Sequence, residues 1–287
     1  ADLIVGVPMA NGLRGTSYVI FGGTNGAFRQ TAVDWLGTTG NDTQSDGGLA
    51  KTLVAGAGDD VLTATGASVL YGGAGGDTFT INGRMIAGLQ NAMGSGGNTV
   101  RLARIDGGTG TDTIALSGAG LTLDLTQVAF VAAGSPDGGS RIDSVERIDL
   151  SGSGNNTLKL SMQDVMALGH SNTFNTDNGW TGLSSSARSQ LVVQGNAGDV
   201  INATDVWVQQ GNASAGGNTY TVWNSSKGAA QLLVAEGVTV NVKAPTVELS
   251  DIADGVGGFV INGISASDRS GNSVSNAGDV NGDGLDD

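Results

Sequence analysis

Apolar residues recur along the chain in short alternating runs, the pattern of β-strands with one buried face. Two such runs lie near the start, "DLIVGVP" and "TSYVIFGG". Residues 117–243 carry many more, at intervals of roughly ten residues with turn signals between them. These runs are "LTLDLTQVAFVAA", "RIDSVERIDLSG", "NNTLKLS", "SQLVVQGN", "DVWVQQG", "NTYTVWN" and "AQLLVAEGVTVNVK". The pattern predicts an all-β fold.

Two segments predict helices instead. The stretch "SMQDVMALG" starts with Ser161 as an N-cap, places Asp164 three residues later and closes with Gly169. A second helix is predicted within residues 82–94. We therefore expect one or two short helices in an otherwise β-rich chain.

The composition fits tight turns between short strands. The 287 residues include 50 glycines but only 3 prolines, and 39 % of them are hydrophobic, which is enough to form a core. A repeat solenoid or another all-β fold agrees best with this balance. Cysteine is absent, which excludes disulfides, thiol catalysis and zinc ribbons.

The net charge of −14 argues against nucleic acid and against anionic membranes as partners. Of the 27 acidic residues only Glu146, Glu236 and Glu248 are glutamate. Aspartate is favoured where a short carboxylate must sit in a turn and reach an ion or a backbone N–H. The imbalance therefore indicates calcium chemistry. No run of 18 apolar residues predicts a membrane span, and no signal peptide is visible at the start.

A nine-residue repeat carries this aspartate. The stretches "AGAGDDVLT" from Ala55, "GGAGGDTFT" from Gly72 and "GGTGTDTIA" from Gly107 match G-G-x-G-x-D-x-U-x, where U is a large apolar residue. A weaker copy, "GTTGNDTQS" from Gly37, lacks the apolar residue. In the full motif the glycines allow a tight turn, the aspartate offers a hard oxygen ligand, and the apolar residue is expected to face inward.

The spacing of the copies predicts how they stack. The first three begin at Gly37, Ala55 and Gly72, which is close to two nine-residue steps each time. In a parallel β-roll alternate turns lie on opposite sides, so the aspartates would line one edge. The intervening turns lack the motif aspartate, and we expect no metal on the other edge.

The repeats resemble the RTX calcium-binding repeats of secreted bacterial proteins. The resemblance implies a calcium-binding β-roll over residues 37–116, with an insertion at about 82–104 that isolates the last copy. In that family calcium binds between turns of the roll. The implied ligand residues and turn glycines are Asp42, Asp60, Asp77, Asp112, Gly40, Gly56, Gly58, Gly73 and Gly75.

The chain ends on a second candidate calcium loop, "DVNGDGLDD". Alternate positions offer oxygens, but the strand-like flanks and the absence of a twelfth-position Glu do not fit an EF-hand. Residues 244–287 resemble the first half of an FG-GAP repeat, the blade unit of integrin-α-type propellers, and residues 1–36 resemble the second half. The candidate ligands are Asp279, Asn281, Asp283, the Leu285 carbonyl and Asp287.

Enzyme chemistry is not expected. The sequence has no H-E-x-x-H, no G-x-S-x-G, no P-loop and no dinucleotide fingerprint. The single histidine, His170, is expected to be structural or exposed. The four tryptophans are expected to pack in the core or on a sheet rather than to stack on sugars. They are Trp35, Trp180, Trp207 and Trp223.

In the region 105–240, the stretches "RIDGGTGTDTIALSGAGLTLDL", "SVERIDLSGSGNNTLKLS" and "VVQGNAGDV" resemble the β-rich segment of very large bacterial surface proteins, and residues 117–243 are expected to form an adhesin-type, solenoid- or sandwich-like segment. The combined expectation is an extracellular, calcium-rigidified structural or adhesive module, exported by type I secretion and holding several Ca²⁺ ions. Its expected partners are neighbouring copies or adjacent repeats, and cell-surface glycans or proteins. The alternatives are a self-assembling surface-layer or filament subunit and a carbohydrate-binding module. For assembly, the strand "LIVGVP" of one copy would complete the split blade of the next. Two other routes stay open: the chain's own N-terminal strand could close the blade, or the parent protein could continue past Asp287 and supply the strand itself.

Overall fold

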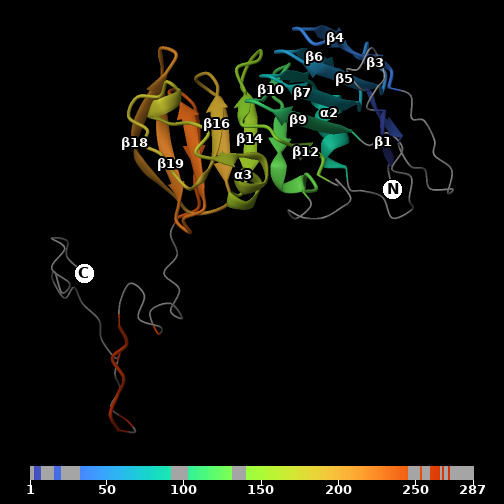
Figure 1. The fold of residues 1–287 in the computed structure, drawn as a ribbon. Coiled ribbons are helices and arrows are strands. Elements are labelled where there is room, and N and C mark those ends of the chain that lie inside the picture. The colour runs from blue at the N-terminus through green and yellow to red at the C-terminus, as the bar shows by residue number, and fades with distance from the viewer. Residues whose placement is uncertain are drawn as a thin grey trace. The chain divides into compact units, whose positions relative to one another are not determined.

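Most of the strands between residues 33 and 243 are parallel and stack as successive turns of one coil (Figure 1). The computed structural model describes residues 33–91, 103–130 and 140–244, the backbone of 3–7 and 16–20, and a few positions between 253 and 271. The chain divides into two units, Ala1–Lys243 and Ala244–Asp287. The predicted strands near the start are confirmed, because β1 (Leu3–Val7) pairs antiparallel with β2 (Thr16–Ile20).

Each turn of the coil adds one parallel strand to each of two sheets. The turns of 17 or 18 residues at the start of the coil agree with the spacing of the motifs. The first sheet contains β3 (Trp35–Leu36), β5 (Thr52–Ala57), β7 (Val69–Ala74), β9 (Arg104–Thr109) and β12 (Ile142–Asp143). The second contains β4 (Thr43–Ser45), β6 (Val61–Ala64), β8 (Thr78–Ile81), β10 (Thr113–Leu116), β13 (Arg147–Asp149), β16 (Ser189–Gln194) and β20 (Ala230–Ala235).

A third sheet joins the coil from the fourth turn onward. Helix α2 (Gly83–Gln90) packs against the first strand of this sheet, β11. The sheet consists of β11 (Thr122–Asp124), β14 (Thr157–Leu160), β17 (Val200–Ala203) and β21 (Thr239–Asn241). The coil therefore has two strands per turn in its first three turns and three in the turns of β9–β11 and β12–β14. The first sheet ends at β12, so the last two turns, β16–β17 and β20–β21, have two strands again.

Antiparallel strands complete the second sheet at the end of the coil. β19 (Asn218–Ser225) pairs with β20 and with β18 (Trp207–Ala215), and the short β15 (His170–Ser171) pairs with β16. Between β15 and β16, the loop that contains η2 (Thr176–Asn178) brings Phe174 and Trp180 onto a small apolar cluster with Tyr220. Trp180 and Trp207 are buried, so for these two the expectation of core packing is confirmed.

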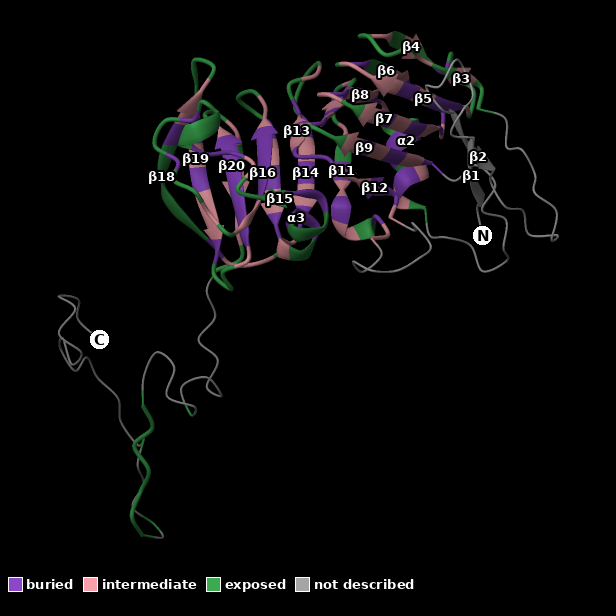
Figure 2. Ribbon diagram, viewed as in Figure 1, coloured by how far each residue is buried: buried purple, intermediate pink, exposed green. Residues whose placement is uncertain are grey.

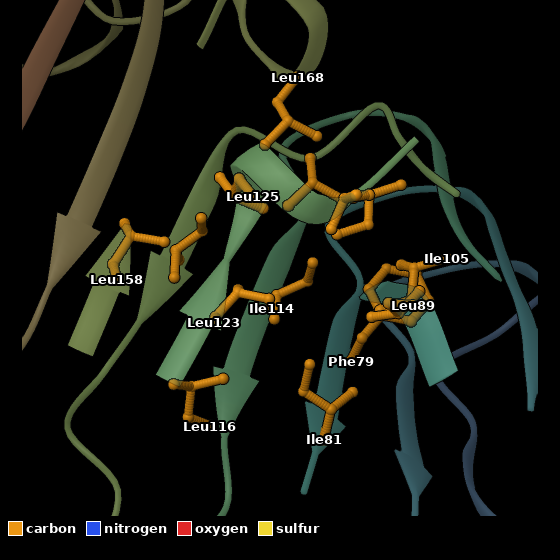
Figure 3. Close-up of a cluster of buried hydrophobic side chains, with 14 of the residues drawn as sticks. Phe79, Ile81, Leu89, Ile105, Ile114, Leu116, Leu123, Leu125, Leu158 and Leu168 are labelled. Carbon is orange, nitrogen blue, oxygen red and sulfur yellow. The ribbon is translucent and has the colours of Figure 1, made fainter. Parts of the chain in front are cut away.

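One hydrophobic core runs through the coil (Figures 2 and 3). The apolar motif residues Leu62, Phe79 and Ile114 lie side by side on β6, β8 and β10 and are fully buried, as the sequence predicted. Their outward neighbours along each strand are polar or partly exposed. Parallel strands in register place equivalent residues on top of one another, so each turn extends the same inner column of apolar side chains. The column continues through Ile148 and Val193 and ends at Val234.

Both predicted helices are present. Helix α3 (Met162–Leu168) has Ser161 as its N-cap, with a reciprocal capping box to Asp164, and Gly169 follows its end. Helix α2 starts after the N-cap Asn82 and ends at Gln90, within the predicted range of 82–94.

Two local expectations need correction. The run "LTLDLTQVAFVAA" is not one strand: β11 ends at Asp124, and the 3-10 helix η1 (Leu125–Gln127) follows. The Asp124 carboxylate accepts the N–H and the hydroxyl of Thr126, a local bond that competes with the sheet. The insertion near 82–104 also does not isolate the last motif, because β10 pairs directly with β8.

Candidate calcium-binding edge

Four carboxylates form a ladder along the turns that join the first sheet to the second. The N–H of Asp42 donates to Oδ1 of Asp60 at 2.7 Å. The N–H of Asp60 donates to Oδ1 of Asp77 at 2.9 Å, and that of Asp77 to Oδ1 of Asp112 at 2.7 Å. The structure thus brings together the four motif aspartates. We call this row the carboxylate edge.

Three of these carboxylates keep an unpartnered oxygen. Asp60, Asp77 and Asp112 are at most 1 % exposed. In each, Oδ2 is buried without a hydrogen-bond partner. An ionised oxygen in that state costs free energy, since burial removes its water and nothing replaces it. At each of the three positions, either a proton on the carboxyl group or a cation beside the oxygen would remove that cost.

Carbonyl oxygens from the next turn face the same places. A Cβ on Gly72 would lie 2.1 Å from Oδ2 of Asp77 and 2.7 Å from the carbonyl oxygen of Gly107. A Cβ on Gly107 would lie 2.5 Å from Oδ2 of Asp112 and 1.9 Å from the carbonyl oxygen of Ser144. At both Gly72 and Gly107, a carboxylate oxygen and a carbonyl oxygen thus lie where the Cβ of any other residue would be. Only glycine can occupy these two positions without displacing the oxygens.

The other motif glycines shape the turns. Gly56, Gly58, Gly73 and Gly75 have φ angles of +109° to +126°, a region that favours glycine. Gly40, in the weaker first copy, does not adopt such a φ, and a Cβ there would meet nothing closer than 4.0 Å.

The first turn of the edge also differs in its carboxylate. Asp42 Oδ2 accepts the N–H and the hydroxyl of Thr38, at 2.6 and 2.8 Å. Asp42 is therefore a weaker ligand candidate than the three that follow it.

We expect Gly73→Ala to destabilise the coil by at least about 2 kcal/mol. Its Cβ would lie 2.0 Å from the carbonyl oxygen of Gly56, and the φ of +115° alone costs an alanine roughly 1–2 kcal/mol. Gly217→Ala is the matched control, because its φ is also positive and its Cβ would meet nothing within 4 Å. Urea unfolding of both variants measures the difference; equal losses would contradict close stacking of the turns.

Burial and neighbouring charge act on these carboxylates together. Burial raises the pKa of Asp112 to about 7, with further contributions from the charges of Glu146, Asp77 and Asp106, against a lowering by the Asp77 N–H. Burial likewise raises the pKa of Asp77, helped by the charges of Asp60 and Asp59. Without a cation, the edge therefore favours the protonated form of Asp112.

Asp46, on the opposite edge of the coil, is a buried aspartate whose oxygens both have hydrogen-bond partners. Asp46 is fully buried, yet its carboxylate accepts N–H groups from Gly48, Thr65 and Gly66 and hydroxyls from Thr65 and Ser68. Burial would raise its pKa, but these hydrogen bonds lower it to about 2. Protein donors already satisfy this carboxylate, so it does not need a cation.

The turns between the second and third sheets carry another satisfied ladder. Leu121 N–H donates to Asn156 Oδ1 at 2.9 Å, and Asn156 N–H donates to Asp199 Oδ1 at 2.7 Å. The second oxygen of Asp199 accepts the N–H of Asn196 at 2.6 Å. Among the described residues, buried carboxylate oxygens without a hydrogen-bond partner thus occur only at the carboxylate edge.

Sequence reasoning missed the next member of the edge. Asp112 N–H donates to Glu146 Oε2 at 2.9 Å, and Glu146 Oε1 lies 2.9 Å from Nδ1 of His170. Glu146 sits outside any motif copy. The signal that could have identified it is its residue type, since the chain has only three glutamates.

Side chains alone do not form a metal cage. Among the described residues, no three acidic or histidine side chains converge on one point that would hold a metal ion. Any ion at the edge must take part of its ligands from backbone carbonyls, which calcium accepts readily. The terminal candidate loop, residues 279–287, lies outside the described residues.

Comparison of the chain with protein-family profiles, curated proteins and solved structures finds no match in any of the three. No helix in the described part of the chain is long and apolar enough to span a membrane.

Proposed function

We propose that this chain is a calcium-binding structural module of an extracellular bacterial repeat protein, of the adhesive type. The observation that carries the proposal is the row of buried carboxylates at Asp60, Asp77 and Asp112, each with one unpartnered oxygen. At Asp77 and Asp112 a carbonyl oxygen of the next turn lies beside that oxygen. The resemblance of the motifs to RTX repeats supports the same assignment.

Calcium fits this oxygen set better than other common ions. It takes six to eight oxygens, from carboxylates, carbonyls and water, in flexible geometry. Magnesium demands a compact octahedron, and zinc prefers nitrogen and sulfur, which the edge does not offer. A bound calcium ion would neutralise the stacked carboxylates and join consecutive turns, so the coil would become stiff only where calcium is abundant.

Extracellular modules typically bind calcium at about 10⁻⁴–10⁻³ M. Sites of this class would stay empty in the cytosol and fill outside the cell. This property suits export in a loosely folded form by type I secretion, followed by folding at the cell surface.

Substitution of one ladder member tests the proposal. In Asp77→Asn, the amide oxygen can still accept the Asp60 N–H, while the amide N–H₂ replaces the unpartnered oxygen beside the Gly107 carbonyl. We expect the variant to be more stable than wild type in EDTA and to gain less from calcium. The lost gain is about 2.7 kcal/mol for one site at a hundredfold excess of calcium over its dissociation constant.

Asp199→Asn is the matched control for this experiment. Both oxygens of Asp199 accept backbone N–H groups, so the amide would leave one N–H facing a donor. We expect an equal loss of stability with and without calcium. If Asp77→Asn also loses stability equally in both conditions, Asp77 is not a calcium ligand. Thermal unfolding of both variants, in calcium and in EDTA, measures these differences.

Head-to-tail assembly is the second candidate role. Among the described strands, β1 pairs only with β2, which leaves the two-stranded sheet with open edges for another strand. The sequence match between the two ends supplies such a strand from a neighbouring copy. Carbohydrate binding has less support, because Trp180 and Trp207 are buried and therefore unavailable to a sugar.

A further inference from the structure

The carboxylate edge continues one turn beyond the last motif. The turn between β12 and β13 is Ser144–Glu146 and contains no glycine and no aspartate. Yet β12 pairs with β9 and β13 pairs with β10, so this turn stacks directly on the turn of Gly107–Asp112. Glu146 takes the place of the next aspartate, because its Oε2 accepts the Asp112 N–H at 2.9 Å.

Glutamate suits this place because the turn is shorter. Only Val145 and Glu146 separate Ser144 from Arg147, whereas five residues separate Gly107 from Thr113 in the turn before it. The additional methylene group of glutamate lets the carboxylate reach the same ladder position from a tighter turn.

Ser144 directs an oxygen at the unpartnered carboxylate. Its φ is +50°, and it is one of only three described residues other than glycine with a positive φ. Such a conformation is strained and persists where the surroundings require it. The Ser144 carbonyl oxygen and Asp112 Oδ2 converge beside the Cα of Gly107, at 1.9 and 2.5 Å from the position that a Cβ would take.

His170 holds Glu146 from the other side. The Glu146 carboxylate is only 2 % exposed, and its Oε1 lies 2.9 Å from His170 Nδ1, on a ring that is 64 % exposed. This arrangement fixes both oxygens of Glu146, one by a backbone N–H and one by the ring. Groups that orient a ligand in this way commonly set its affinity for a metal.

The charge at this end of the edge favours a cation. Asp77, Asp106 and Glu146 all act electrostatically on Asp112. Asp143 lies beside Asp106 on the neighbouring strand. The counter-charge on these strands is Arg104, whose guanidinium lies 3.1 Å from Asp106. The region therefore remains strongly negative around the unpartnered Asp112 oxygen.

We propose that a divalent cation binds between the turn of Gly107–Asp112 and the motif-free turn of Ser144–Glu146. Asp112 Oδ2 and the Ser144 carbonyl are its ligands, and Glu146 with His170 are positioning residues. This inference rests on the proposed function and extends it by one site that the repeat pattern does not contain. The ion would tie the last motif-bearing turn, β9–β11, to the motif-free turn of β12–β14 that follows.

Native mass spectrometry across a calcium titration of the intact chain tests the proposal. We expect Glu146→Gln to lower the affinity for one calcium ion about 10–100-fold and to leave the affinity for the other ions unchanged. The amide keeps an oxygen for the Asp112 N–H, so the ladder geometry is preserved. Glu236→Gln is the matched control, because it removes the same charge at the far end of β20 and should bind as wild type.

Two more variants separate positioning from simple stability. Glu146→Asp retains the charge and should recover part of the affinity lost in Glu146→Gln. Ser144→Gly retains the carbonyl and should keep the ion. If Glu146→Gln does not fold, as judged by its far-ultraviolet circular dichroism, the same titration of His170→Ala, a change at an exposed ring, is expected to weaken one ion.

The outcomes distinguish this site from the proposed function. If Glu146→Gln, or His170→Ala in its place, binds the wild-type number of ions at wild-type affinity while Asp77→Asn loses one, the additional site does not exist and the calcium module stands. If the wild-type chain binds no calcium at all, both proposals fail.

Discussion

Removal of calcium is expected to unfold the motif-bearing turns of the coil, or to lower their melting temperature by about 20 °C or more. Each occupied site adds about 2.7 kcal/mol at a hundredfold excess of calcium, so three sites add roughly 8 kcal/mol. This gain is comparable with the whole stability of an ordinary domain, about 5–15 kcal/mol. In a unit of this size, 1 kcal/mol shifts the melting temperature by about 2–4 °C.

Circular dichroism and calorimetry in calcium and in excess EDTA measure this effect. Amide hydrogen exchange shows which part of the chain unfolds. Backbone amides of β5 to β10, which flank Asp60, Asp77 and Asp112, should lose their protection first. The ladder at Asn156 and Asp199 should keep its protection longer, because protein donors satisfy it. Re-addition of calcium, but not of magnesium, should restore the fold. Superimposable melting curves in calcium and EDTA would refute calcium-coupled folding.

The sequence predicted the stacked part of the fold well because its signals are local and periodic. The apolar column of Leu62, Phe79 and Ile114 follows directly from the motif, and so does the ladder of Asp60 on Asp77. Helix α3 was also predictable, because Ser161 and Asp164 form a capping box with a fixed spacing. In each case a short pattern contains the whole physical cause.

The remaining features depend on contacts between residues distant in the chain. The coil gains its third sheet where α2 packs on β11, and no sequence motif marks this position. Glu146 joins the edge only because β12 and β13 stack on β9 and β10, about 34 residues away in the sequence. The unpartnered oxygen of Asp112 is likewise invisible in sequence, since it depends on burial and on the absence of a second donor.

The carboxylate edge should bind protons when it cannot bind calcium. Asp46 and Asp112 are both fully buried, but five donor groups hydrogen-bond to the Asp46 carboxylate, and one hydrogen-bonds to that of Asp112. The pKa of Asp46 falls to about 2, whereas that of Asp112 rises to about 7. Protonation and calcium binding are thus two ways to neutralise the same buried charge at Asp112.

The metal-free protein is therefore expected to become more stable in mild acid. Because the folded-state pKa of Asp112 is raised from 3.8 to about 7, folding favours its protonated form. That contribution is fully present below about pH 4 and is lost as the pH rises to 7. It amounts to roughly 4 kcal/mol at 1.36 kcal/mol per pKa unit. Asp46, with its pKa near 2, adds no slope in this window.

Melting temperatures in EDTA between pH 4.5 and 7.5 test this expectation. Wild type should melt at a higher temperature at the acidic end, while Asp112→Asn, which cannot ionise there, should show a much flatter dependence. In calcium the wild-type trend should reverse, because the ion requires the ionised carboxylate and acid displaces it. The gap between the calcium and EDTA curves should thus close as the pH falls. If the melting temperature in EDTA depends on pH in the same way for wild type and Asp112→Asn, Asp112 is ionised even without a cation. The argument that this turn requires a cation would then fail.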